Sequence, residues 1–173
     1  DRIGRKFLGA GLGFGGGCLP KDIRAFMARA GELGADQALT FLREVDAINM
    51  RRRQRVVDLS REMLGSLIGK RITVLGAAFK PNSDDVRDSP ALAVAGQLSL
   101  AGASVRVYDP QGMDNARKVF PTLDYAASLE DALARIGLQP AATVTLQSVV
   151  EEESTGNGAL MTHLRGYRVV AVD

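Results

Sequence analysis

The sequence predicts an α/β protein in which a long helix precedes a Rossmann-like domain with a parallel sheet. Apolar residues recur at helical spacing over 36–64, which predicts a helix of about 28 residues and about 40 Å. Two short apolar runs, 71–75 and 104–108, have the composition of strands. Between them, Pro90 opens a helical segment that ends near Ala101. This order forms a βαβ unit, which is expected to be parallel and right-handed.

The glycines at 65–69 mark the expected boundary between two parts. We assign 1–68 to a central helical segment and 69–173 to the Rossmann-like domain. The long helix carries one apolar stripe and outreaches a small domain, so we expect it to pack on a second copy and form a homodimer. The stripe consists of Phe41, Val45, Ile48, Val56, Leu59 and Met63.

Weaker patterns complete the expected domain. We interpret 129–136 as a short helix and 142–146 as a strand. A helical turn over 160–164 and a last strand over 167–172 follow the polar segment 151–158, which we interpret as a loop.

Composition excludes several classes of function. A net charge of +2 is too small for a nucleic-acid binder, and the absence of Trp argues against a base-stacking surface. No apolar run reaches the roughly 18 residues that a membrane span requires. One cysteine excludes an internal disulfide and fits a reducing compartment, so we expect a cytoplasmic protein. No metal site is predicted.

The most informative stretch runs from Gly13 to Asp22 and contains the single cysteine, Cys18. A glycine-rich loop ends at this cysteine, and Pro20 suits the first turn of a helix expected over 21–33. A helix start favours an anion, so a thiol there should ionise readily, and Lys21 adds positive charge. Asp22 could accept a proton or orient a water molecule. Alternatively, Cys18 is a small buried residue in a turn, and Lys21 with Asp22 is a surface pair.

Three further features receive structural interpretations. Residues 11–16 match G-x-G-x-x-G, but no strand pattern precedes them, so we reject them as a dinucleotide phosphate loop. Asp109 follows a strand, but it lies too far from Gly76 to be the ribose-binding acid of such a fold. We favour the solvated face of the long helix for the arginine-rich run 51–55 over a direct role in ligand binding.

Five stretches resemble the UDP-glucose/GDP-mannose dehydrogenase family, in the order of that family. They are 2–8, 13–22, 49–55, the pair 74–81 and 84–90, and 107–110. The resemblance implies NAD-dependent oxidation of the sugar C6 alcohol of UDP-glucose to the carboxylate of UDP-glucuronate, using two NAD per turnover. The family's N-terminal NAD domain has no counterpart here, so we expect the 173-residue chain alone to be inactive.

The resemblance also implies roles for individual residues. Cys18 would attack the C6 aldehyde to give a thiohemiacetal, and oxidation would give a thioester that water hydrolyses. Asp22 would position or deprotonate this water, while Lys21 and Arg87 would contact NAD. Substrate contacts would come from Arg2 of the neighbouring subunit, from Gly9, Ala10, Gly11, Leu12, Gly13, Phe14 and Gly15, and from Phe79 and Lys80 at the uridine and phosphates.

Alternatives remain at this point. Lys80 and Arg87 could instead pair with Asp84, Asp85 and Asp88 in a solvated loop. GDP-mannose is a second possible substrate, because the family's GDP-mannose enzymes share the segment 18–22. The alternative to an enzyme is a sugar-nucleotide-binding and dimerisation module in which the cysteine is vestigial.

Overall fold

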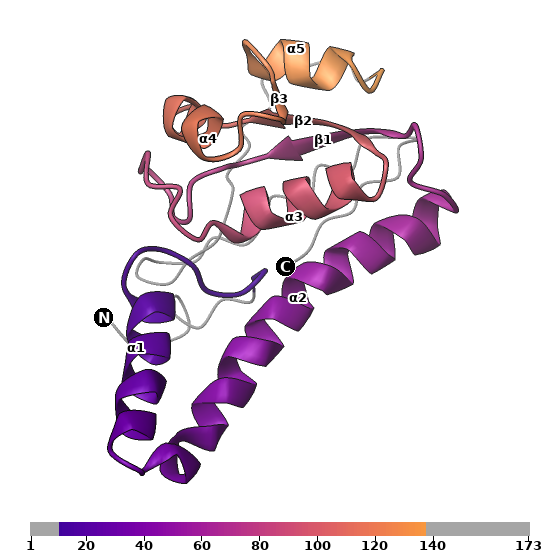
Figure 1. Cartoon of the computed structure of the whole chain (residues 1–173). Coiled ribbons are helices and arrows are strands. Elements are labelled where there is room, and N and C mark those ends of the chain that lie inside the picture. Colours follow the sequence, from indigo (N-terminus) through magenta and orange to yellow (C-terminus); the bar gives the residue numbers. More distant parts are fainter. Residues whose placement is uncertain (1–10, 138–173) are drawn as a thin grey trace.

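A parallel sheet organises residues 11–137, the part of the chain that the computed structural model describes (Figure 1). The sheet has the order β1-β2-β3, and both strand pairs are parallel. The elements in chain order are α1 (Leu19–Glu32), the 3-10 turn η1 (Asp36–Leu39), α2 (Thr40–Leu64), β1 (Arg71–Leu75), α3 (Pro90–Leu100), β2 (Ser104–Tyr108), α4 (Met113–Val119), β3 (Asp124–Tyr125) and α5 (Leu129–Ala134).

The predicted βαβ unit is confirmed. β1 and β2 have the predicted bounds, and they pair in parallel from Arg71 opposite Ser104 to Leu75 opposite Tyr108. α3 connects them and begins where Pro90 was expected to open a helix. The hydroxyl of Ser89 caps this helix by accepting a hydrogen bond from Leu92 N at 3.2 Å.

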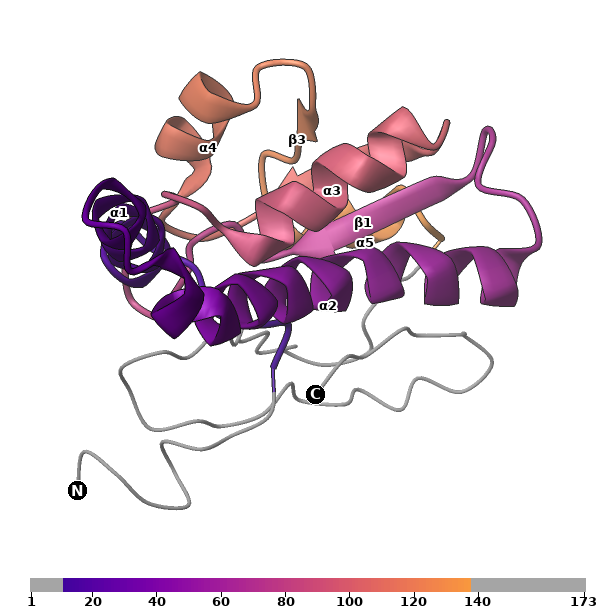
Figure 2. The same ribbon diagram turned by 60° about the horizontal axis from the view of Figure 1, so that its bottom comes forward.

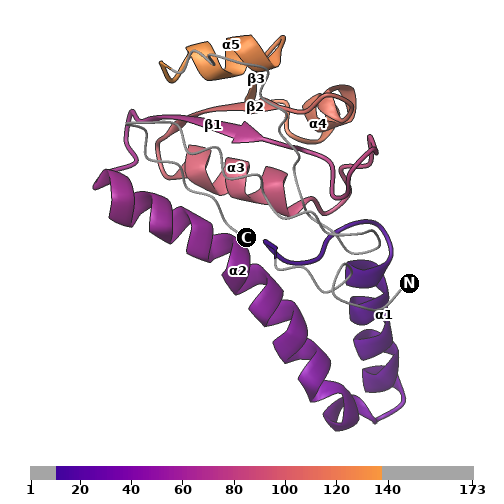
Figure 3. The same cartoon turned by 180° about the vertical axis from the view of Figure 1, so that it is seen from behind.

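Helices cover both faces of the sheet. α3 lies between the sheet and α2, while α5 lies on the opposite face, where Thr73 Oγ1 donates to Ala132 O at 3.0 Å (Figures 1 and 3). The main apolar core lies between the sheet, α3 and the second half of α2. Its buried members include Val57, Leu92, Val105 and Val107.

The first part of the chain forms a helical hairpin whose arms diverge from the turn at η1 (Figures 1 and 2). The sequence predicted one helix over 36–64, and the predicted start of this helix is wrong. Asp36 opens the 3-10 turn instead, and α2 starts at Thr40 without a side-chain cap. The predicted end at Gly65 is confirmed by its positive φ of 77°.

The apolar stripe of α2 divides into two halves. Val56 is buried in the core against α3, whereas Phe41 and Ile48 are 60% and 51% exposed. The first half of α2, which carries Phe41 and Ile48, extends beyond the sheet together with α1 (Figure 3). One periodic pattern therefore supplies both a core face and a surface that has no cover within residues 11–137.

Short elements between β2 and α5 were not predicted. α4 has seven residues and β3 has two, which is too short for a clear periodicity. The helix expected over 129–136 is present as α5. The elements expected over 142–146, 160–164 and 167–172, and the loop over 151–158, lie outside the described residues.

Asp109 fixes the carboxyl ends of β1 and β2 against each other. Its buried carboxylate accepts hydrogen bonds from the backbone N–H groups of Ala77, Ala78, Gln111 and Gly112, at 2.7 to 3.1 Å. Burial raises the pKa of this carboxyl, but the four backbone hydrogen bonds outweigh burial and the net pKa is lowered. The structural interpretation of Asp109 is therefore supported.

Replacing Asp109→Asn is expected to lower the free energy of unfolding at pH 7 by about 1–3 kcal/mol, because an amide NH₂ would face backbone donors. The carboxylate contributes fully above its unfolded pKa of about 3.9, and its contribution is lost as pH falls through the depressed folded pKa. Urea unfolding from pH 7 down to pH 3 should therefore show the wild-type advantage shrinking at the acid end. A constant difference would contradict this role.

Candidate functional site

Cys18 lies where the glycine-rich loop meets α1, as the sequence predicted. It is the residue before the first helical position, it is exposed, and its carbonyl accepts the first helical hydrogen bond from Asp22 N at 2.8 Å. Pro20 is buried in the first turn and sets the direction of the helix. The thiol therefore stands in solvent at the positive end of a 14-residue helix. The alternative of a buried Cys18 is wrong.

Lys21 and Asp22 lie on the same first turn. Their side chains are 69% and 66% exposed, and Lys21 Nζ is 3.1 Å from Asp22 Oδ1. An exposed pair of this kind adds little to stability, so both groups can turn toward a ligand at low cost. Their roles in catalysis stay predictions.

The loop before Cys18 rests on the segment after β1. Gly16 N donates to Arg87 O at 2.9 Å, and a Cβ at Gly16 would lie only 2.7 Å from the ring of Phe79. Gly16 also has a φ of 85°, which side-chain-bearing residues rarely adopt. At Gly17, a Cβ would lie 2.4 Å from the guanidinium carbon of Arg87. The loop therefore depends on glycine at position 16, whereas at position 17 the exposed Arg87 side chain could move aside.

The Arg87 guanidinium lies beside both Gly17 and Cys18. Its Nε donates to Asp85 Oδ1 at 2.9 Å, and this hydrogen bond is the largest cause that raises the pKa of Arg87 and lowers that of Asp85. Attraction between Arg87 and Cys18 makes a smaller contribution in the same direction to the pKa of Arg87. The alternative in which Arg87 pairs with an aspartate is thus present, and this pair holds the cation beside Gly17, next to the cysteine.

Phe79 and Lys80 follow β1 at its carboxyl end. Phe79 is only 7% exposed, lies under Gly16, and donates its backbone N–H to Asp85 O at 3.0 Å. Lys80 Nζ lies 5.1 Å from the centre of the Phe79 ring. The carboxyl edge of the sheet, where ligands of open α/β sheets bind, therefore joins the loop that carries Cys18.

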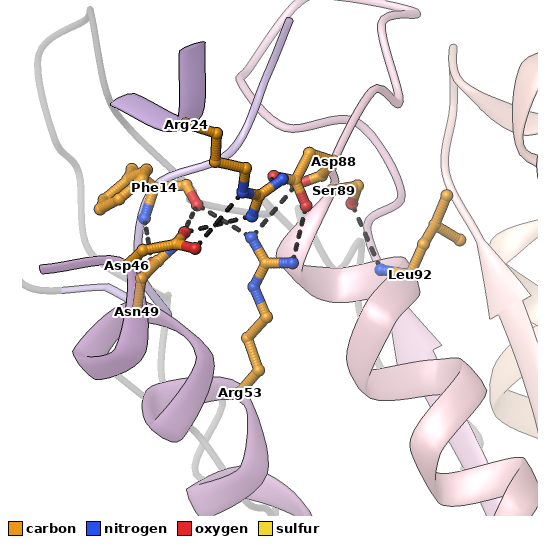
Figure 4. A network of polar contacts seen from close by, with 8 residues as sticks. All are labelled: Phe14, Arg24, Asp46, Asn49, Arg53, Asp88, Ser89 and Leu92. Atoms are coloured by element: carbon orange, nitrogen blue, oxygen red, sulfur yellow. Dashed lines mark hydrogen bonds and ion pairs between the residues drawn. The ribbon is translucent and has the colours of Figure 1, made fainter. Parts of the chain in front are cut away.

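Other predicted contact residues are placed less centrally. Gly11 O accepts from Arg52 Nη2 at 3.1 Å, and Leu12 packs against the main core. The backbone of Phe14 is held by Asn49 and Arg53 of α2 (Figure 4). Arg2, Gly9 and Ala10 lie outside the described residues.

Two polar residues of α2 were missed as parts of the site. Asn49 and Arg53 are each only 3% exposed, so placing the whole run 51–55 on the solvated face is wrong for Arg53. Arg53 follows Asn49 by four residues and precedes Val56 by three, so all share one helix face. This spacing could have predicted the burial of Asn49 and Arg53, because it places both on the helix face that contains the buried Val56.

Two negative findings apply to residues 11–137. No cluster of three or more His, Cys, Asp and Glu side chains is arranged to hold a metal ion. Within the same range, no helix is long and apolar enough to cross a membrane.

The fold and site together define an α/β protein with an exposed cysteine at the carboxyl edge of a parallel sheet. Two models of one family match the chain, the central domain over 1–51 and the UDP-binding domain over 73–144. The chain belongs to the UDP-glucose/GDP-mannose dehydrogenase family.

Relatives and solved structures agree with this membership. A UDP-glucose 6-dehydrogenase of Haloferax volcanii is 48% identical over 78% of this chain and 30% of its own length. One of Bacillus subtilis is 39% identical over 76% of this chain and 30% of its own length.

Two solved structures are similar as well. The structure of a UDP-glucose dehydrogenase from Pyrobaculum islandicum has a TM-score of 0.69 and 43% identity over 78% of this chain and 31% of that one. A GDP-mannose dehydrogenase from Pseudomonas aeruginosa has a TM-score of 0.63 and 28% identity over 76% of this chain and 31% of that one. The chain therefore spans about a third of the length of these relatives.

Proposed function

We propose that this chain forms part of an NAD-dependent enzyme that oxidises UDP-glucose to UDP-glucuronate, with Cys18 as the nucleophile. The observation that supports this most is the exposed Cys18 at the start of α1, with the Arg87 guanidinium beside it. A thiol in such an electropositive, accessible place is a better nucleophile than a buried one. A working thiolate needs a reducing compartment, so we also propose a cytoplasmic location.

We propose UDP-glucose as the substrate because three of the proteins compared above carry that sugar nucleotide in their names. Lys80, in the segment that follows β1, supplies a cation for the diphosphate, and Phe79 shapes the surface beneath it. The loop from Gly9 to Gly15 would wrap the sugar nucleotide, and Arg2 would reach the substrate of the neighbouring subunit. GDP-mannose is the second candidate, favoured by the similarity to a GDP-mannose dehydrogenase.

The chemistry assigned to this chain centres on Cys18. Its Sγ attacks the C6 aldehyde carbon of the sugar, and Lys21 stabilises the oxyanion that forms. After oxidation of the resulting thiohemiacetal, Asp22 orients or deprotonates the water that attacks the thioester carbonyl. That attack releases the carboxylate and regenerates the Cys18 thiolate, which the positive end of α1 stabilises.

NAD, when bound, accepts the hydrides that leave C6. Arg87 and Lys21 fit this cofactor, since both are exposed cations beside Cys18 and can hold an anionic group there. We propose that the 173-residue chain, which spans 30% of the length of the UDP-glucose 6-dehydrogenases that it matches, binds UDP-glucose without producing NADH.

The hairpin of α1 and α2 supports a homodimer through the long helix. Phe41 and Ile48 repeat at seven-residue spacing on α2, and both are more than half exposed. Residues seven apart share one helix face, so α2 presents an apolar stripe. Phe26 of α1 and Leu33, the residue after α1, are exposed to a similar extent. A second copy of the chain is the proposed cover.

Alkylation of Cys18 tests the proposed site, because it is the only thiol in the chain. Saturating UDP-glucose is expected to slow the reaction with iodoacetamide by about threefold or more, since the sugar would cover the thiol. Lys80→Gln should remove this protection. Lys70→Gln is the matched control, because Lys70 stands at the opposite end of the same strand.

Equal alkylation rates with and without UDP-glucose would overturn the proposed function. Protection by GDP-mannose in place of UDP-glucose would move the substrate to the second candidate. Binding of UDP-glucose by calorimetry without any protection of Cys18 would favour the binding and dimerisation module.

The dimer is tested by Phe41→Asp with Ile48→Asp, which should convert the chain to a monomer in sedimentation velocity. Burying two unpaired carboxylates in an apolar interface costs several kcal/mol in total, which a weak interface does not survive. Leu100→Asp is the control, because Leu100 is 90% exposed at the end of α3. A wild-type chain that sediments as a monomer at 100-fold dilution and at high concentration alike would contradict the proposal.

A further inference from the structure

We propose that Asn49 and Arg53 of α2 are positioning residues that hold the Cys18 thiol against the Arg87 guanidinium. This inference rests on the proposed function of Cys18 and deepens it by naming what sets the place of the nucleophile. Among the described residues, neither side chain hydrogen-bonds to Cys18; both hold the backbone of Phe14 (Figure 4).

Asn49 pairs with the backbone of Phe14 in both directions. Phe14 N donates to Asn49 Oδ1 at 2.9 Å, and Asn49 Nδ2 donates to Phe14 O at 2.9 Å. The side-chain amide thus imitates a neighbouring strand and fixes the peptide plane four residues before the cysteine. Gly13 makes this approach possible, because a Cβ there would lie 2.1 Å from Asn49 Oδ1.

Arg53 joins the same backbone to the segment after β1. Its Nη2 donates to Phe14 O at 3.0 Å, and its Nη1 donates to Asp88 Oδ1 at 2.9 Å. Asp88 stands directly after Arg87 and has a positive φ of 45°. One buried guanidinium therefore sets the distance between the loop that ends at Cys18 and the turn that carries Arg87.

α1 is tied to the same point. Arg24 Nη2 donates to Asp46 Oδ1 at 3.1 Å and lies 3.8 Å from Asp88 Oδ2 (Figure 4). The helix that begins after Cys18, the loop before Cys18 and the turn beside it therefore all meet at Asp88. A shift of any one of them changes the position of the thiol relative to the cation.

The cluster is poorly explained as a device for stability alone. Among the residues that the structure describes, nothing hydrogen-bonds to the buried Arg53 Nε, and the buried Asp88 Oδ2 has Arg24 Nη2 at 3.8 Å, beyond hydrogen-bonding distance. Buried polar atoms without partners reduce stability, and buried ion pairs can often be replaced by apolar residues at no loss. An apolar side chain in place of Arg53 could not form the directional hydrogen bonds to Phe14 O and Asp88 Oδ1.

The test compares alkylation of Cys18 by anionic iodoacetate with alkylation by neutral iodoacetamide at pH 7. The ratio of the two rate constants reports how close the Arg87 guanidinium and the α1 start lie to the thiol, because these attract the anion. In the wild-type chain this ratio should exceed that of the urea-unfolded chain. Asn49→Ala and Arg53→Met are expected to lower it by about threefold or more, toward the unfolded value.

Two further variants make the comparison specific. Arg53→Lys should restore part of the ratio, because an ammonium keeps the Asp88 pair but cannot also hold Phe14 O in a fork. Gln54→Ala is the matched control on the same helix, since Gln54 is exposed and its side chain donates a hydrogen bond to Asp58, away from Phe14 and Asp88. If circular dichroism shows that Asn49→Ala is unfolded, Asn49→Asp decides, because it keeps the volume but cannot donate to Phe14 O.

A folded Asn49 variant with the wild-type ratio would overturn the inference, as would an equal loss in Gln54→Ala. These outcomes differ from a failure of the proposed function. If the proposed function fails, UDP-glucose does not protect Cys18 of the wild-type chain, and this result does not depend on the ratio of the two alkylation rate constants in the variants.

Discussion

The buried contact between Arg53 and Asp88 is the constraint on which the rest of the arrangement depends. It lies where α2, the start of α3 and the loop before Cys18 converge, and it is the only described ion pair in which one side chain is less than a tenth exposed. An arginine buried at this point needs a carboxylate, and the same guanidinium then has donors left for Phe14 O. The glycine loop is in this way attached to a helix whose other half packs in the core.

A second buried carboxylate completes the support from the opposite side. Asp109 accepts hydrogen bonds from the backbone N–H groups of Ala77 and Ala78. These two residues directly precede Phe79, whose ring lies against Gly16. The exit of β1 is therefore fixed before the chain reaches the site. The exposed groups Cys18, Lys21 and Arg87 need no burial of their own, because the backbone that carries them is held from below by Asp88 and Asp109.

Local patterns in the sequence predicted much of this. β1, β2 and the start of α3 were predicted with their bounds because apolar runs and Pro90 act over a few residues. α4 and β3 were not, because their placement depends on contacts such as that of the Tyr125 hydroxyl with Phe120 O at 2.8 Å. The position of Cys18 followed from its neighbours. The burial of Arg53 did not, because its exposed neighbours Arg51, Arg52 and Arg55 gave the run the composition of a solvated face.

Amide hydrogen exchange at Phe14 and Gly16 tests the central claim most directly. Their N–H groups donate to Asn49 Oδ1 and to Arg87 O, although both belong to a loop without regular secondary structure. The account predicts that both exchange more slowly than unstructured amides by about a hundredfold or more, and that they slow together. Exchange of both at the rate of an unfolded chain, while the amides of α3 remain protected, would show that the loop is not held and would contradict the account.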